Sequence, residues 1–340
     1  MSKTLLRNLV LGTGLALIST GGAFADELNL YTSREPGLVK PLLEAFTAET
    51  GIAVNTVFLK DGIVERLASE GDSSPADLLM AVDAGNLVDL VERGLTQPVE
   101  SEVLTAAIPA QLRDEGNQWF ALSMRARVVY AAKELGLTEI TYDDLADPKW
   151  DDKICIRSGQ HPYNTALISA YYSHNGAEKT EAWLNGLKDN LARKAGGGDR
   201  DGAKDILGGI CDLAVANSYY VGLMRSGAGG DEQKAWAESF DVVLPTFANG
   251  GTHVNVSGAA VAKHAPNKDN AVKLLEFLVS DEAQKIYAKA NFEYPVKPGA
   301  ELDPIIADFG TLNVDSLALT EYVKNRKEVS ELIDRVGFDN

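Results

Sequence analysis

The chain has few of the residues that enzymes use for nucleophilic or metal chemistry. Its 340 residues include two cysteines and four histidines. The histidines, at positions 161, 174, 253 and 264, show no metal-ligand spacing, and the cysteines lack C-x-x-C spacing. There is no G-x-S-x-G elbow, phosphate-binding loop, H-E-x-x-H or dinucleotide fingerprint. We therefore expect no enzyme, although distant segments could still assemble a catalytic group without a motif.

Positive charge is also scarce. The chain has 32 Lys and Arg against 49 Asp and Glu, which gives a formal net charge of −17. A protein with this charge is repelled by nucleic acid and by anionic membrane surfaces, so neither is an expected partner. The acidity favours solubility and is compatible with a cationic ligand.

Long hydrophobic runs are missing as well. None reaches the roughly 20 residues that span a bilayer, so we expect a protein that is not embedded in a membrane. The N-terminus has Lys3 and Arg7, then a short apolar run at 9–18, then small residues up to Ala25. This order is typical of a secretory signal peptide. We expect residues 1–25 to be removed and the mature, exported protein to start near Asp26.

The rest of the chain alternates strand and helix patterns. Strands are expected at 27–31, 52–58 and 77–82, and helices at 37–50 and 62–70. This alternation predicts an α/β fold with a parallel sheet covered by helices.

The alternation breaks at 117–132, which predicts antiparallel strands or a crossing between two lobes. Residues 254–261 have the pattern of a strand that returns to the first lobe. We therefore predict lobe 1 from 26–125, mainly lobe 2 with crossing strands near its ends from 126–245, and a return to lobe 1 with C-terminal helices from 246–340. Two lobes joined by crossing segments form a cleft that closes around small ligands.

Three tyrosines are the candidate functional residues. Tyr219 and Tyr220 follow a buried strand and precede a helix expected from Val221, and Tyr163 occupies a similar strand-to-helix turn. Helix N-termini favour anions, including phenolates. Phenols have pKa values near 10, but a trivalent hard cation would deprotonate them. The alternative, which spacing alone favours, is that all three are cleft or core aromatics with ordinary hydrogen bonds.

Cys155 and Cys211 both lie in strand-like runs. An even number of cysteines in an exported protein favours a disulfide if the two strands are neighbours. The alternative is a pair of buried free thiols.

Several segments resemble the periplasmic ferric-iron-binding proteins. Residues 30–34, LYTSR, are similar to the first strand and loop of that family, and the tyrosine pair in NSYY with a third tyrosine at position 163 is the most specific part. The similarity covers nearly all of the mature chain. Further matching segments are 82–87, 94–99, 125–130, 155–158 and 197–199.

The resemblance implies a two-lobed periplasmic binding protein fold of type II, in which each lobe is a mixed, mainly parallel sheet flanked by helices. It implies that the protein captures Fe³⁺ in the interlobe cleft through the phenolates of Tyr163, Tyr219 and Tyr220. It also implies a periplasmic monomer that delivers iron to the membrane permease of an ABC importer.

One family position departs from the common pattern. Many members place a histidine ligand after the first Ser-Arg, whereas this chain has Glu35 and Pro36. Glu35 could supply a carboxylate oxygen or be a solvated residue. We expect the arrangement of family members that use three tyrosines and a synergistic anion, here carbonate, with Arg125, Ser33 and Arg34 as its donors. The competing hypothesis is a binding protein for an organic anion, a sugar phosphate or another small solute, with tyrosines and arginines as non-metal contacts.

Overall fold

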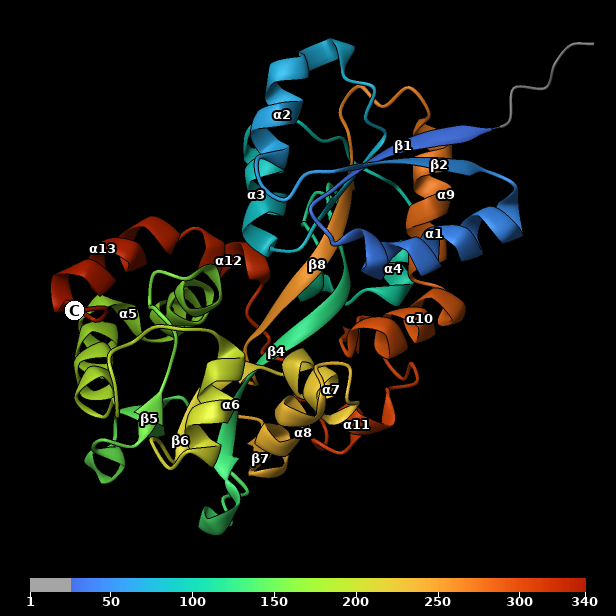
Figure 1. Ribbon diagram of the computed structural model, residues 1–340. Helices are drawn as coiled ribbons and strands as arrows, with labels where there is room; N and C mark the ends of the chain where they lie inside the picture. The colour runs from blue at the N-terminus through green and yellow to red at the C-terminus, as the bar shows by residue number, and fades with distance from the viewer. Residues whose placement is uncertain (1–25) are drawn as a thin grey trace, which may run out of the picture.

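The computed structural model describes residues 26–340, so the predicted signal peptide at 1–25 lies outside the described residues. Figure 1 shows two lobes connected by two long strands, β4 (Phe120–Ala132) and β8 (Val254–Val261). The predicted two-lobed α/β architecture is confirmed. Within the described part, no helix is both long and apolar enough to cross a membrane.

The first lobe is built on the parallel strands β1 (Glu27–Thr32), β2 (Ala53–Phe58) and β3 (Leu78–Ala81). Strand β3 is buried along its whole length and pairs antiparallel with β8. The helices of this lobe are α1 (Pro36–Thr50), α2 (Ile63–Glu70), α3 (Ala84–Glu92), α4 (Glu102–Ala107), α9 (Lys268–Leu278) and α10 (Asp281–Asn291).

Helix α1 illustrates how local sequence determines these elements. Pro36 begins the helix, where its missing N–H costs nothing. Val39, Leu42 and Phe46 recur at helical spacing and are buried, and Gly51 ends the helix with a left-handed φ of 75°.

The second lobe contains β5 (Ile154–Cys155) and β6 (Leu213–Asn217), which are parallel, and β7 (Phe240–Val243). The first helix of this lobe, α5, kinks at Gly176, where φ is 78° and ψ is 175°. The helices of this lobe are α5 (Pro162–Asp189), α6 (Asp199–Leu207), α7 (Tyr219–Arg225) and α8 (Asp231–Glu238).

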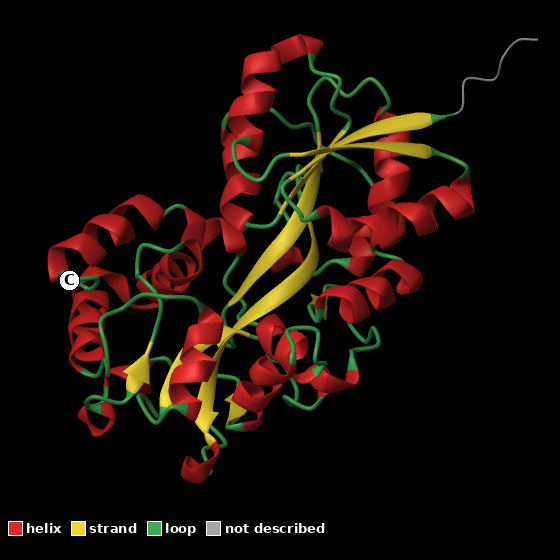
Figure 2. Ribbon diagram, viewed as in Figure 1, coloured by secondary structure: helices red, strands yellow, loops and turns green. Residues whose placement is uncertain are grey.

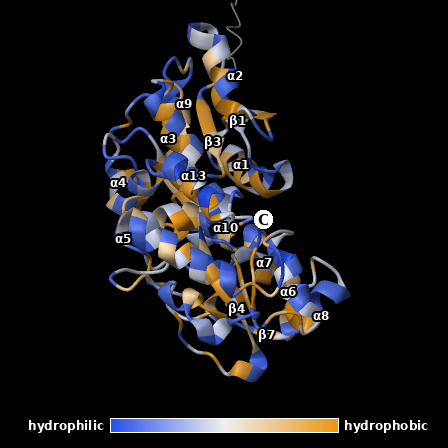
Figure 3. Ribbon diagram, turned by 90° about the vertical axis from the view of Figure 1, so that its left-hand side faces the viewer, coloured by the Kyte–Doolittle hydropathy of each residue, from blue (hydrophilic) through white to orange (hydrophobic). Residues whose placement is uncertain are grey.

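Strand β4 joins the two lobes. Its first half pairs with β8, and its second half pairs with β6 and β7, all antiparallel. The mixed sheet therefore runs in the order β2-β1-β3-β8-β4-β6-β5. Figure 2 shows the long strands that join the lobes in yellow. Figure 3 shows hydrophobic residues gathered along strands such as β3 and β4, which are covered on both faces.

The C-terminal part contacts both lobes. Strand β9 (Tyr294–Pro295) pairs with β4, and α11 (Pro304–Ala307) leads to α12 (Leu319–Val323) and α13 (Arg326–Val336). Helix α12 contacts both α3 and α5. Helix α13 packs on α5, where the Lys188 ammonium donates to the Val336 carbonyl at 3.0 Å. The final helix thus lies on the second lobe.

Candidate metal-binding site

The structure brings Tyr163, Tyr219 and Tyr220 together. Strand β6 ends at Asn217 and α7 begins at Tyr219, so the predicted helix start at Val221 was two residues late. The rings of Tyr219 and Tyr220 lie with their centroids 4.1 Å apart. Tyr163 arrives from the first turn of α5.

The pKa shifts show that the phenol groups interact. Burial raises the pKa of Tyr219 well above its ordinary value, and Tyr163 and Tyr220 raise it further. Burial also raises the pKa of Tyr220, and Tyr163 is the next cause. Because like charges repel, each phenolate would disfavour the next. The cluster therefore keeps Tyr219 and Tyr220 protonated at neutral pH unless a cation joins it.

Two arginines lie over these rings. The guanidinium carbon of Arg157 is 5.1 Å from the Tyr163 ring centroid, and that of Arg200 is 5.7 Å from the Tyr220 ring centroid. His161 caps α5 by accepting from the backbone N–H of Tyr163 at 3.2 Å. Burial and Arg157 lower the pKa of His161 to about 4, so this imidazole is neutral at pH 7.

A buried ionic network joins the elements that carry the tyrosines. The Asp199 carboxylate binds Arg127 at 2.6 Å and Arg157 at 3.2 Å. Arg127 also donates to the Asn164 side chain at 2.6 Å, and Asp199 accepts from the Asn217 backbone N–H at 2.8 Å. This network fixes the start of α5, the start of α6 and the end of β6 relative to one another.

Sequence reasoning did not assign Asp199 or Arg127 to the site. Both belong to segments that resemble the ferric-binding family, at 197–199 and 125–130. The available signal was an acidic residue at the first position of a helix after three glycines, which suits a buried charge at a helix N-terminus.

The predicted anion donors lie on the first lobe. Arg34 donates to Ser257 Oγ at 2.5 Å and pairs with Glu293 at 2.8 Å. Arg125 donates to the same Ser257 Oγ at 3.0 Å. Burial acts to lower the pKa of Arg34, but Glu293 and the phenols of Tyr287 and Tyr219 raise it overall. Arg34 in lobe 1 is therefore close enough to the Tyr219 phenol in lobe 2 to interact with it electrostatically.

Ser33 and Glu35 have different surroundings. The Ser33 hydroxyl accepts from the Val82 backbone N–H at 3.2 Å, which joins the loop after β1 to the loop after β3. Glu35 is exposed, and its side chain does not cap α1.

The predicted disulfide is confirmed. Cys155 of β5 bonds Cys211, with the two Cα atoms 5.8 Å apart. The bond ties β5 to the residue two positions before β6, the strand that leads to Tyr219. No free cysteine remains among residues 26–340.

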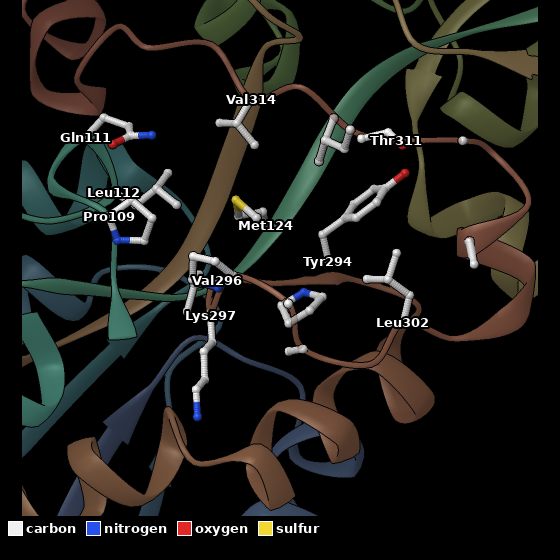
Figure 4. Close-up of a pocket in the computed structure, with 17 residues that line it drawn as sticks. Pro109, Gln111, Leu112, Met124, Tyr294, Val296, Lys297, Leu302, Thr311 and Val314 are labelled. Atoms are coloured by element: carbon white, nitrogen blue, oxygen red, sulfur yellow. The ribbon is translucent and has the colours of Figure 1, made fainter. Parts of the chain in front are cut away.

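Other metal sites have little support. Residues 26–340 contain no group of three or more His, Cys, Asp or Glu side chains that could hold a metal ion. A cavity of about 530 Å³ lies beside β4, with Met124 and Tyr294 pointing toward it (Figure 4). None of the predicted site residues lines this cavity. The tyrosine cluster is thus the metal-site candidate in the described chain.

The chain was compared with known families and structures. Residues 73–309 match the bacterial extracellular solute-binding protein family. Iron uptake protein A1 of Synechocystis is 40% identical, and the match covers 92% of this chain and 88% of that protein.

Solved structures agree with this result. The Bordetella ferric binding protein is 60% identical, with a TM-score of 0.90 over 93% of this chain and all of that chain. The Trichodesmium protein IdiA (FutA), in complex with iron and citrate ligands, is 40% identical, with a TM-score of 0.87 over 92% of this chain and 99% of that one. The chain therefore belongs to the bacterial extracellular solute-binding proteins and, within them, to the periplasmic ferric-iron-binding proteins of ABC transporters.

Proposed function

We propose that this protein captures Fe³⁺ between its lobes through the phenolates of Tyr163, Tyr219 and Tyr220. The observation that carries the proposal is the convergence of three phenols. Burial, Tyr163 and Tyr220 raise the pKa of Tyr219, and burial and Tyr163 raise that of Tyr220. A trivalent cation reverses the balance by attracting all three phenolates.

The charges of this site are matched. Three phenolates neutralise Fe³⁺, and oxygen donors suit a hard cation. Helix α5 begins one residue before Tyr163 and supplies a positive dipole end that favours its phenolate. Arg157 and Arg200 add positive charge beside the rings of Tyr163 and Tyr220.

An oxyanion completes the coordination in this proposal, and carbonate is the expected anion. Arg34, Arg125 and Ser33 of the first lobe would hold this anion in our proposal, because a guanidinium fork fits a planar oxyanion. Glu35, exposed at the start of α1, is the alternative oxygen donor. The citrate in the Trichodesmium structure makes a carboxylate anion a second candidate.

Delivery follows from family membership. The exported, iron-loaded protein acts in the periplasm as a monomer and passes Fe³⁺ to the membrane permease of an iron ABC importer. It performs no chemical reaction on its ligand in this proposal.

The test uses visible absorption. Loading purified protein with ferric citrate in the presence of bicarbonate should produce a tyrosinate-to-iron charge-transfer band. Tyr163→Phe, Tyr219→Phe and Tyr220→Phe should each weaken or abolish it. Tyr172→Phe is the matched control, because Tyr172 lies on α5 as Tyr163 does but belongs to no part of the site. No band in the wild type, or a band unaffected by all three site variants, would overturn the proposal.

The competing solute-binding function predicts a different result. A binding protein for an organic anion would bind its ligand without iron. Its Tyr→Phe variants would then show no change in visible absorption. Tight anion binding to metal-free protein, without a charge-transfer band on iron addition, would support that function instead.

A further inference from the structure

Glu293 is a buried carboxylate on the first lobe, where it contacts Arg34. One carboxylate oxygen pairs with Arg34 at 2.8 Å, and the other accepts from the Ser123 hydroxyl. The side chain is 5% exposed. Neither the sequence patterns nor the resemblance assigned a function to this residue.

The fold fixes this carboxylate firmly. Glu293 immediately precedes β9, which pairs with β4 at Ser123 and Met124. The preceding residue, Phe292, has a left-handed φ of 54° and packs against Gly222 of α7. The segment that carries Glu293 therefore touches the helix that carries Tyr219 and Tyr220.

Glu293 also determines where Arg34 points. Arg34 divides its guanidinium between Glu293 and Ser257 Oγ, and Arg125 donates to that same hydroxyl. The Glu293 carboxylate stays ionised, because Arg34 and Arg125 outweigh the effect of burial and lower its pKa. Arg34, Arg125 and Glu293 thus form one buried group with a net charge of +1.

The second lobe has a similar group behind the tyrosines. Arg127 and Arg157 share the Asp199 carboxylate, so this group also has a net charge of +1. An iron ion bound by three phenolates adds no net charge. The two groups together carry a charge of +2, and the Arg200 guanidinium over the Tyr220 ring adds a further positive charge.

We propose that Glu293 is a positioning residue that holds Arg34 against Ser257 and reduces the positive charge that an anion meets on the first lobe. This inference rests on the proposed ferric function. By cancelling one of the two guanidinium charges, Glu293 weakens attraction for every anion, and it does so most for the most highly charged. The preference of the site for highly charged anions is therefore smaller than it would be without Glu293.

Glu293→Gln tests this inference, because glutamine keeps the shape and one acceptor oxygen but removes the charge. Metal-free protein is titrated with Fe³⁺ in bicarbonate-free buffer containing formate, oxalate or citrate. The measured quantity is the anion concentration at half-maximal charge-transfer absorbance. Each anion chelates iron in solution identically for both proteins, so the ratio of wild type to variant isolates the protein's contribution.

The expected decrease in the anion concentration at half-maximal absorbance grows with the charge of the anion. Because Coulomb energy is proportional to charge, the variant should need about threefold less formate, about tenfold less oxalate and about thirtyfold less citrate. A purely structural role of Glu293 would change all three by the same factor or weaken all three. Either of those outcomes would overturn the inference.

Two further variants complete the test. Glu293→Asp keeps the charge and should keep wild-type anion selectivity even if it lowers the melting temperature. Glu301→Gln removes an exposed charge of the same sign, paired with Lys285, and should change no ratio. If the wild type develops no band with any anion, the ferric function itself fails. If it does, and Glu293→Gln shows no dependence on anion charge, only the assignment of Glu293 fails.

Discussion

Asp199 and Arg127 form an ion pair of 2.6 Å whose side chains are 0% and 2% exposed. The same carboxylate oxygen accepts from the Asn217 backbone N–H, two residues before Tyr219. A buried pair of this kind contributes little net stability compared with an apolar pair, but losing one partner leaves an uncompensated charge. The position of the tyrosine helix therefore depends on both members.

Asp199→Asn should strongly destabilise the protein. The change leaves Arg127 buried without its carboxylate, and we expect the free energy of unfolding to fall by about 3–5 kcal/mol. Urea unfolding followed by circular dichroism measures this. Asp212→Asn is the control, because its pair with Lys153 is at the surface and 3.7 Å long, and surface pairs contribute roughly 0–1 kcal/mol. Equal losses in the two variants would contradict the importance of the buried pair.

Gly222→Ala should disturb α7. A Cβ at this position would overlap the Phe292 side chain, whereas one at Gly208 would meet nothing closer than 3.5 Å. Overpacking of this kind costs about 1–3 kcal/mol, and it should also displace Tyr219 and Tyr220. We expect a lower melting temperature and a weaker iron charge-transfer band for Gly222→Ala but not for Gly208→Ala.

The double variant Gly222→Ala, Phe292→Ala separates a clash from a general helix effect. Removing the ring should restore part of the band that Gly222→Ala loses. If the loss of band intensity in the double variant equals the sum of the losses in the two single variants, the contact with Phe292 is not the cause.

Iron binding should release protons and strengthen as pH rises. The pKa values of Tyr219 and Tyr220 are raised, so these groups are protonated at neutral pH and must lose their protons to bind Fe³⁺. With iron supplied as ferric oxalate, we expect three protons per bound ion, and two for each single Tyr→Phe variant. Titration of the released acid in unbuffered solution measures this number. Binding without proton release would mean that the phenols are not ligands.

Local sequence predicted much of the fold. The strand and helix patterns of the first lobe match β1 to β3 and α1 to α2 within one or two residues, because periodicity and turn residues act locally. For residues 117–132 the sequence left open antiparallel strands or a crossing between the lobes, and β4 is a single strand that makes the crossing. The polar residues Ser123 and Arg125 interrupt its apolar pattern. Both residues are buried because their polar groups are hydrogen-bonded, Ser123 to Glu293 and Arg125 to Ser257. No local sequence pattern reveals these distant partners.

The site was predicted in part. The strand-to-helix turns pointed to the three tyrosines, the resemblance gave them their proposed role as ligands, and the structure brings them together. Neither the turns nor the resemblance gave a role to the buried carboxylates next to the site. These carboxylates are Asp199 and Glu293, whose partners Arg127 and Arg34 are 72 and 259 positions away in the chain. Ion pairs of such separation depend on how β4 and β8 join the lobes, so they can be found only after the chain has been folded.

The most direct measurement is an iron-edge anomalous difference map from a crystal of the ferric protein. Tyrosine coordination predicts a single strong peak within bonding distance of the Tyr163, Tyr219 and Tyr220 phenolic oxygens, with anion density between the iron and Arg34 or Arg125. A peak at any other place in the cleft, or one that contacts none of the three phenols, would contradict the central claim.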